Sequence, residues 1–278
     1  MDTQANYRSL SSTESRLVLG LTEEGRRELT RRDAIKRFEL SAKTADDILK
    51  NLVRKGWLAR AGHGKYLLIP PEWGATPTGE SNVLALASQL TPDGYIAFST
   101  AAAHWGLTTQ LRNVIWVVTR THARNRRIND NEVRFARLPI KAMFAIERVD
   151  VYGYPVPMSD REKTVLDCIA YPDRAGGIAE ASAILANAAR RWQWEKAIDY
   201  LERLGNTALI QKIGYLCTAA QLAMPDTLRS RLRKRLKPSS RTYLVPHVRG
   251  GGEPRFKSRY DREWGVVVNL DPGLLFKL

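Results

Sequence analysis

The spacing of apolar and polar residues between positions 30 and 55 predicts two consecutive helices. The first begins at Thr30 and is short and amphipathic. After a break, Ser41 supplies an N-cap oxygen for a second helix that extends to about Lys55. Gly56 follows, where a helix C-cap is expected. One stripe of the second helix is apolar at helical spacing. Its residues are Ala45, Ile48, Leu49, Leu52 and Val53.

The next residues predict a small β-hairpin with a basic tip. Residues 57–60 and 65–69 have the composition of strands, and the turn Ala-Gly-His-Gly at 61–64 separates them. Helix, turn, polar-faced helix and basic hairpin is the order of a winged helix-turn-helix. We therefore expect this fold at the N-terminus of the chain.

The residue types on the outer face of the second helix suit DNA. A helix in the major groove needs long donors, hydroxyls or amides to reach the base edges. These residues are Lys43, Thr44, Lys50, Asn51 and Arg54. A wing needs cations near phosphates, which His63 and Lys65 supply between glycines. Arg31 and Arg32, at the start of the first helix, are further candidates for DNA contact.

Two carboxylates in the second helix favour a different interpretation. Asp46 and Asp47 would face phosphates unfavourably, so the domain could be a packing module with an ordinary solvated face. They could instead complement the helix dipole or accept hydrogen bonds from cytosine amino groups. Both interpretations remain open from the residues alone.

Length and charge limit the class of protein and its partners. The 278 residues are enough for two domains, or three, and a hydrophobic content of 44% is enough for proper cores. The formal charge of +15 indicates a polyanionic partner, most simply nucleic acid. No apolar run approaches ~18–20 residues and no signal peptide is recognisable, so we expect no membrane partner and a cytoplasmic location. Cys168 and Cys217 are expected as buried thiols rather than as a disulfide.

The positive charge gathers in two clusters outside the predicted winged helix. The denser one, here called the basic tail, runs from Arg229 to Arg262. Its candidate DNA contacts are Arg229, Arg231, Arg233 and Arg235. A weaker cluster consists of Arg120, Arg124, Arg126, Arg127, Arg134 and Arg137. Either cluster could extend a phosphate-binding face or hold bent DNA, and the alternative is a solubilising surface.

The rest of the chain predicts a larger mixed domain. Proline, glycine, threonine and serine at 70–81 indicate a linker, which divides the chain into domains 1–75 and 82–278. Strands are expected at 95–98, 114–119, 132–138, 151–156, 242–245 and 264–269. Helices are expected at 84–90, at 99–107, from a capping box of Ser159 and Glu162 to Ala170, and over 178–223 with breaks near Trp192 and Gly205. The fold class is therefore α+β, with an N-terminal winged helix-turn-helix and a larger mixed α+β C-terminal domain.

Two segments of the second domain resemble a known family. Ser99-Thr-Ala-Ala-Ala-His-Trp-Gly-Leu107 is similar to the Ser…Ala…Trp/His-Gly-Leu segment of the AbiEi antitoxins. Pro157-Met-Ser-Asp-Arg-Glu-Lys-Thr-Val-Leu-Asp-Cys-Ile-Ala-Tyr-Pro-Asp-Arg-Ala-Gly-Gly177 resembles their "ERT-L-D…P…GG" segment. These are the antitoxins of abortive-infection type IV toxin–antitoxin systems, and an N-terminal winged helix matches the family's order. The basic tail does not align with the family pattern residue by residue.

The resemblance implies a non-enzymatic autorepressor without a cofactor. Its winged helix would bind inverted repeats of double-stranded DNA in the promoter of its own operon, as a monomer in solution that binds DNA cooperatively. Its second domain would assist DNA binding and neutralise a nucleotidyltransferase-like toxin without a stable complex. The resemblance implies that Lys43, Thr44, Lys50, Asn51 and Arg54 belong to the recognition helix and that His63 and Lys65 belong to the wing. Antitoxin activity would reside in residues 99–107 and 161–177.

Enzymatic and sensory alternatives are also open. Asp160, Glu162 and Lys163 have the residue types of a nuclease site, although helical spacing and capping explain them as well. The four histidines, His63, His104, His122 and His247, have no metal-ligand spacing, and no phosphate-cradling loop is present. A plain ligand-responsive regulator with a winged helix is the main alternative.

Overall fold

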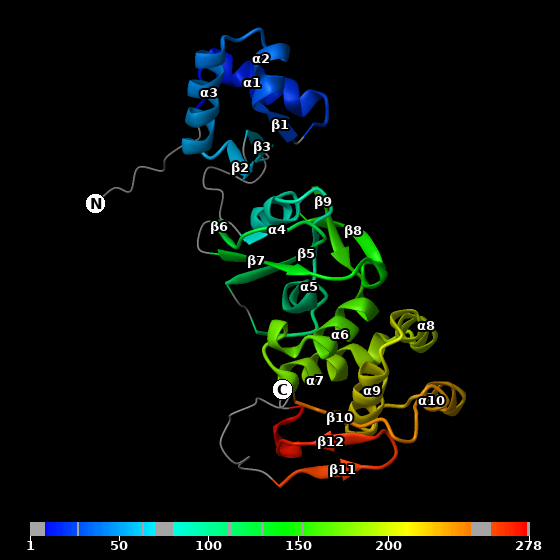
Figure 1. The fold of residues 1–278 in the computed structure, drawn as a ribbon. Helices are drawn as coiled ribbons and strands as arrows, with labels where there is room; N and C mark the ends of the chain where they lie inside the picture. The colour runs from blue at the N-terminus through cyan, green and yellow to red at the C-terminus, as the bar shows by residue number, and fades with distance from the viewer. Residues whose placement is uncertain are drawn as a thin grey trace.

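The computed structural model shows a mixed α+β protein, as the sequence predicted. It describes residues 9–26, 28–62, 64–69, 80–110, 113–128, 131–151, 153–245 and 257–276. His63, most of the predicted linker (70–79) and the middle of the basic tail (246–256) lie outside the described residues. The molecule is elongated, with a small domain at one end, a large sheet in the middle, and helices with a second small sheet at the other end (Figure 1).

The small N-terminal domain is a winged helix. Its three strands form an antiparallel sheet in the order β1-β3-β2, against which three helices bury one apolar core. The elements are α1 (Ser12–Glu23), β1 (Glu28–Thr30), α2 (Arg31–Arg37), α3 (Ala42–Arg54), β2 (Leu58–Gly62) and β3 (Lys65–Leu68). The predicted helix-turn-helix and hairpin are therefore confirmed.

Short-range hydrogen bonds explain where α2 and α3 begin. Thr30 and Asp33 form a capping box, in which each side chain accepts a hydrogen bond from the other residue's backbone N–H. The Ser41 hydroxyl accepts from the N–H of Thr44 and caps α3. Gly56 has a φ of 74°, a left-handed conformation that ends the helical path after α3.

The second domain is built on a mixed six-stranded sheet in the order β6-β7-β5-β4-β9-β8. Its strands are β4 (Tyr95–Ile96), β5 (Val114–Thr119), β6 (Arg126–Ile128), β7 (Asn131–Arg137), β8 (Ile146–Val151) and β9 (Tyr154–Ser159). The helix α4 (Glu80–Ser88) packs on one face of the sheet. The helices α5 (Phe98–His104) and α6 (Arg161–Ala170) pack on the other face.

Two sequence predictions in this domain were wrong. Residues 151–156 are not one strand, because Gly153, with a φ of 80°, turns the chain between β8 and β9. Ser159 does not cap the next helix, since it ends β9, and Asp160 is the N-cap instead. The Asp160 carboxylate accepts from the N–H of Lys163 at 2.8 Å. Glu162 therefore forms no capping box with Ser159.

Helices form most of the remaining chain. The predicted breaks near Trp192 and Gly205 are confirmed, but a helix over 226–233 was not predicted. These elements are α7 (Ile178–Ala188), α8 (Trp194–Leu204), α9 (Thr207–Ala219) and α10 (Asp226–Arg233), with the single turns η2 (Ile140–Ala142), η3 (Pro172–Arg174), η4 (Ala189–Arg191) and η5 (Pro272–Leu274). A small sheet, β10 (Thr242–Tyr243), β11 (Arg259–Asp261) and β12 (Val266–Val268), packs beside α9. Cys168 and Cys217 are free and buried, as predicted.

The hairpin of the winged helix also contacts the second domain. Ala59 of β2 and Leu67 of β3 belong to the same apolar cluster as Leu86 of α4 and Tyr154 of β9. The sheet of the winged helix therefore contributes to two cores, one inside its own domain and one shared with the next. The domain boundary between 70 and 82 stays a prediction.

Candidate nucleic-acid interface

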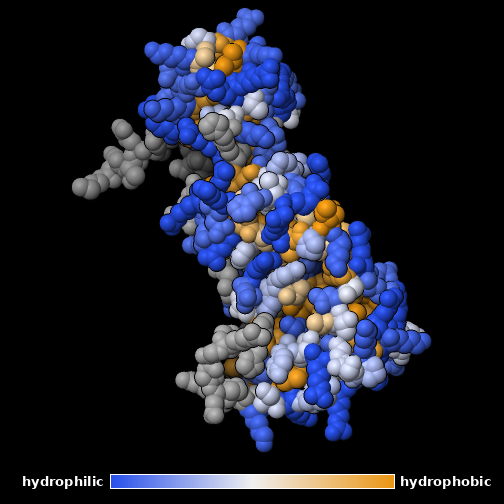
Figure 2. Space-filling view, in the orientation of Figure 1, coloured by the Kyte–Doolittle hydropathy of each residue, from blue (hydrophilic) through white to orange (hydrophobic). Residues whose placement is uncertain are grey.

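The polar face of α3 is exposed, as the sequence predicted. Lys43, Thr44, Lys50 and Arg54 are exposed and Asn51 is half-buried, and these five residues are here called the α3 face. The apolar stripe lies against the domain core, where Leu49 and Leu52 are fully buried. Hydrophilic residues cover most of the visible surface around α3 (Figure 2). The helix thus presents donors to solvent while its other side anchors it.

Two hydrogen bonds restrain side chains of the α3 face. The Arg54 guanidinium donates from its NH2 nitrogen to Asn51 Oδ1 at 3.1 Å. The Thr44 hydroxyl lies 2.8 Å from the Ser41 hydroxyl in the N-cap. Asn51 therefore fixes part of the Arg54 side chain and leaves its other donors available.

An ion pair between α2 and α3 involves Arg31 and Asp46. Arg31 Nε lies 2.6 Å from Asp46 Oδ1, and its NH2 nitrogen lies 2.8 Å from Oδ2. The hydrogen bonds from Arg31 lower the pKa of the Asp46 carboxyl. Asp46 is thereby neutralised locally, and Arg31 already has a carboxylate partner. Arg32 is exposed and forms no ion pair within the described residues.

The hairpin brings Lys65 close to the start of α2. The Arg31 N–H donates to the Gly64 carbonyl at 2.8 Å, and Lys65 pairs with Thr30 across the sheet. Lys65 is exposed. Lys65 therefore lies beside the start of α2, which the ion pair between Arg31 and Asp46 links to α3.

Three of the four arginines predicted to contact DNA in the basic tail form ion pairs with acidic residues of the protein. Arg231 donates to both carboxylate oxygens of Glu202, at 2.9 and 2.7 Å, and to Asp199 at 2.8 Å. Arg235 lies 3.3 Å from Glu202, and Arg229 lies 3.7 Å from Glu263. These acidic partners were not recognised from the sequence, because two of the three lie on α8, far from the tail along the chain.

Arg233 differs from these three arginines. It is exposed and forms no ion pair within the part of the chain that the structure describes. However, α10 lies at the opposite end of the molecule from α3 (Figure 1). The structure therefore does not bring α10, with Arg233, and the α3 face together in one monomer.

The weaker arginine cluster lies at the edge of the large sheet. Arg126 and Arg127 of β6 are exposed, while Arg134 pairs with Glu132 at 2.8 Å. Arg120 is bound by Asp93, which also accepts a hydrogen bond from the Thr119 hydroxyl at 2.6 Å. Burial raises the pKa of Asp93, but the hydrogen bonds from Thr119 and Arg120 outweigh it and lower the pKa to about 2.

The residues considered for a nuclease have structural partners. Lys196 of α8 lies 3.0 Å from Asp160 and 3.0 Å from Glu162, and both carboxylates are buried. Lys163 is completely buried and its ammonium group binds Asp167 one turn further along α6, at 2.5 and 2.6 Å. Lys196 therefore joins α8 to the start of α6, whereas Lys163 and Asp167 pair within α6 and Lys163 does not reach solvent.

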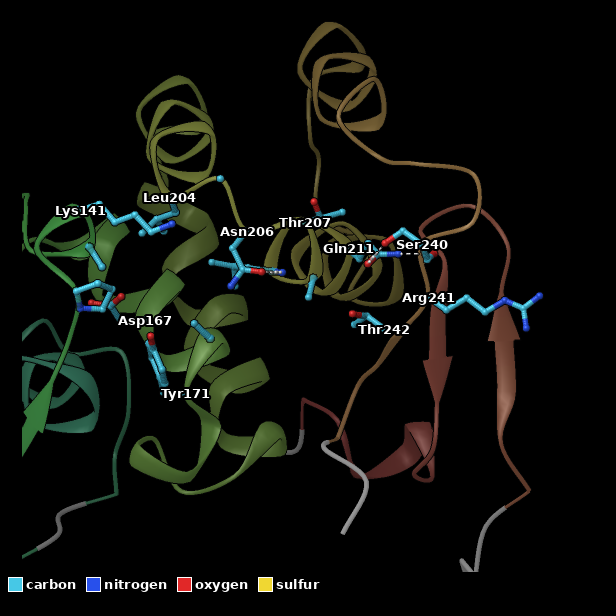
Figure 3. Close-up of a pocket in the computed structure, with 16 residues that line it drawn as sticks. Lys141, Asp167, Tyr171, Leu204, Asn206, Thr207, Gln211, Ser240, Arg241 and Thr242 are labelled. Atoms are coloured by element: carbon cyan, nitrogen blue, oxygen red, sulfur yellow. Dashed lines mark hydrogen bonds between the residues drawn. The ribbon is translucent and has the colours of Figure 1, made fainter. Parts of the chain in front are cut away.

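The second domain contains a polar cavity of about 530 Å³. It lies between α6, the turn from α8 to α9, and β10 (Figure 3). Asp167 and Tyr171 form one wall and Asn206 and Thr207 another, whereas Arg241 points away from them. The Arg241 guanidinium lies over the Tyr260 ring, with its Cζ atom 5.1 Å from the ring centroid.

Two negative findings concern the described residues only. No group of three or more His, Cys, Asp and Glu side chains is arranged to hold a metal ion. None of the helices in the described ranges is long and apolar enough to cross a membrane.

The element order, the antiparallel three-stranded sheet and the exposed basic face of α3 define a winged helix-turn-helix of the DNA-binding class. Residues 22–69 match the model of a family described as "Transcriptional regulator, AbiEi antitoxin". This match is consistent with the AbiEi resemblance, and it concerns the N-terminal domain rather than the two segments of the second domain. The family is a regulatory class rather than an enzyme class.

The whole fold is similar to a solved structure, titled as the RV2827C protein from Mycobacterium tuberculosis. The TM-score is 0.63 and the sequence identity is 21%, with 94% of this chain and 92% of that chain covered. At this identity the likeness concerns the fold alone. A search among curated proteins found no match.

Proposed function

We propose that the protein represses its own toxin–antitoxin operon by inserting α3 into the major groove of inverted repeats in the promoter. The observation that carries this proposal is the α3 face, where exposed lysine, arginine, threonine and asparagine side chains lie opposite a buried apolar stripe. Lys65 and Arg32 would contact phosphates on either side. The protein would be a monomer in solution and bind neighbouring repeats cooperatively.

We further propose that the second domain neutralises a nucleotidyltransferase-like toxin without a stable complex. The two segments that resemble the AbiEi antitoxins contact each other, since the Trp105 indole N–H donates to the Ser159 carbonyl at 2.9 Å. The α6 segment is mostly interior, with every residue from Glu162 to Ile169 buried. These segments would therefore support the antitoxin surface from inside, and the groups that act on the toxin would be exposed residues on the elements around them.

A pair of assays with one variant tests both halves of the proposal. The variant Lys50→Ala/Arg54→Ala removes two exposed cations of the α3 face and no core contact. Wild-type protein should protect repeats upstream of its own gene from nuclease cleavage, and the variant should not. Co-expression of either protein should rescue cells from the product of the adjacent toxin gene. Absence of promoter protection by the wild type contradicts the repressor role, and absence of rescue by both contradicts the antitoxin role.

A ligand-responsive regulator is the second candidate, and the cleft described next is the observation that favours it. The neighbouring gene discriminates between the two. A nucleotidyltransferase gene immediately downstream supports the antitoxin, whereas a metabolic operon supports the regulator.

A further inference from the structure

A cleft of about 750 Å³ lies between the winged helix and the second domain. Its upper wall comes from the turn after α1 and from β1 and β3. Its lower wall comes from the turn between α4 and β4 and from the β8–β9 hairpin. This junction cleft is within the size range of small-molecule sites, roughly 300–1,000 Å³.

Three cationic side chains from three separate segments line the junction cleft. They are Arg26 after α1, Lys65 on β3 and Arg148 on β8, and Glu28 is the only acidic residue among the lining residues that the structure describes. Within the described residues, Lys65, Arg148 and Glu28 take part in no ion pair, and Arg26 has one longer pair, at 3.6 Å with Asp33. The three cations outnumber the single acidic lining residue, so the cleft carries an excess of positive charge. An anion bound there would relieve this repulsion.

A buried hydroxyl in the same wall also lacks a partner. Thr91 lines the cleft and is only 6% exposed, and its Oγ1 atom forms no hydrogen bond with the residues that the structure describes. Buried polar groups are normally hydrogen-bonded, because leaving one unpaired costs free energy. The Oγ1 atom itself is closed off from solvent, so Thr91 forms part of the cleft wall and the anion site rests on the three cations alone.

We propose that the junction cleft binds a small phosphate-bearing anion, held by Arg26, Lys65 and Arg148. Its lower wall, formed partly by β8 and β9, lies on the opposite side of the molecule from α3 (Figure 1). This position favours a free small molecule over the DNA backbone as the source of the phosphate. Lys65 also belongs to the surface assigned above to DNA. If the proposed repressor function holds, an anion that engages Lys65 therefore weakens operator binding.

Calorimetric titration of the full-length protein with inorganic pyrophosphate tests the site directly. We expect saturable binding of one pyrophosphate per chain. Arg148→Gln should weaken it at least tenfold, because one of three cations is lost. Arg137→Gln is the matched control, since Arg137 is an exposed arginine of the same sheet outside the cleft, and it should change the affinity less than twofold. Arg148 is exposed on an edge strand and pairs with no carboxylate among the described residues, so its replacement should not unfold the domain.

The Thr91→Val variant gives a second control. It should leave the pyrophosphate affinity within twofold of wild type, because the hydroxyl that it removes is buried in the cleft wall and the cations hold the anion. Absence of one-to-one saturation, or equal losses in Arg148→Gln and Arg137→Gln, overturns the proposal.

Operator binding at constant ionic strength separates the two sources of phosphate. If the ligand is a free anion, wild type and Arg148→Gln should bind the operator equally tightly in the absence of pyrophosphate. Added pyrophosphate should then lower the operator affinity of wild type more than that of Arg148→Gln. If Arg148→Gln alone lowers the salt dependence of DNA binding by roughly 0.9 in log–log slope, Arg148 contacts the DNA backbone and the small-anion proposal fails. A protein that binds pyrophosphate but no operator refutes the repressor function while the anion site stands.

Discussion

Replacing Asn51 and Arg54 singly and together measures how α3 reads its operator. A bidentate contact between an arginine and a guanine is worth about 1–3 kcal/mol of discrimination. We therefore expect Arg54→Ala to raise the operator Kd roughly 5- to 160-fold. The same change should have a much smaller effect on a scrambled duplex, which offers no specific base contact.

The hydrogen bond between these residues makes their effects non-additive. Asn51 Oδ1 accepts one of the five N–H donors of Arg54 at 3.1 Å, so the guanidinium is oriented but not used up. Part of the loss in Asn51→Ala should then come from a disordered Arg54. In the Arg54→Ala background that part disappears, and the double variant should lose less than the sum of the single variants. Residues in contact typically couple by about 0.5–3 kcal/mol, and an exposed hydrogen bond belongs near the lower end.

Wild type, the two single variants and the double variant form a double-mutant cycle. Fluorescence anisotropy at one salt concentration gives their four dissociation constants for the labelled operator, and again for a scrambled duplex. Lys36→Ala, which removes an exposed lysine from α2 rather than α3, controls for the loss of charge. Denaturant unfolding should show stability changes within about 0.5 kcal/mol, since the two side chains lie outside the core. Additivity within about 0.3 kcal/mol, or equal losses on both duplexes, would refute the proposed reading geometry.

Other expectations concern stability and charge. Lys163→Met leaves the buried carboxylate of Asp167 without its partner and should lower the free energy of unfolding by roughly 3–5 kcal/mol. The double variant Lys163→Met/Asp167→Leu should recover part of this loss, as measured by urea unfolding. A double variant no more stable than Lys163→Met contradicts the pairing. The pKa of Asp93 falls from 3.8 in the unfolded chain to about 2 in the folded protein. Above pH 4, the ionised carboxylate should therefore contribute about 2 kcal/mol to the free energy of unfolding, and this contribution should be lost as the pH falls through 2. The stability difference between wild type and Asp93→Asn should narrow over that pH range, and a constant difference would disprove the linkage. Arg233→Ala should lower the log–log salt slope of DNA binding by roughly 0.9 if Arg233 contacts a phosphate, and Arg231→Ala should change it less because Glu202 holds that guanidinium. Equal slopes for wild type and Arg233→Ala would remove the tail from the DNA interface.

The winged helix could be predicted from the sequence because its determinants are local. Thr30 and Ser41 cap helices through residues three positions away, and Gly56 ends α3 through its own backbone conformation. Such signals lie within one turn of the residues that they control. The apolar stripe of α3 determines which side chains face solvent. The exposure of the α3 face could therefore be predicted from the sequence.

Interactions between distant segments could not be predicted in the same way. The carboxylates that bind Arg231 lie on α8, 29 and 32 residues earlier in the chain, and no local pattern connects them. The β8–β9 hairpin was missed although Gly153 marks its turn, because apolar residues on both sides of the glycine suggested a single strand. Lys163 was considered for a nuclease site, with helical spacing as the other explanation, and its burial beside Asp167 was not predicted because it depends on the helices packed around α6. The junction cleft combines segments more than a hundred residues apart, from Arg26 to Arg148, each unremarkable alone.

The hairpin that joins two cores also affects how DNA specificity can diverge. Ala59 and Leu67 attach the winged helix to α4 and Tyr154, whereas base-reading groups lie on α3, a separate element. Substitutions on the α3 face can therefore change the preferred operator without disturbing the seam between domains. Exchange of the whole winged helix is different, because a grafted domain must also carry small and apolar residues that fit the surface of α4. Related regulators should consequently diversify their target sites by point substitution more readily than by domain shuffling.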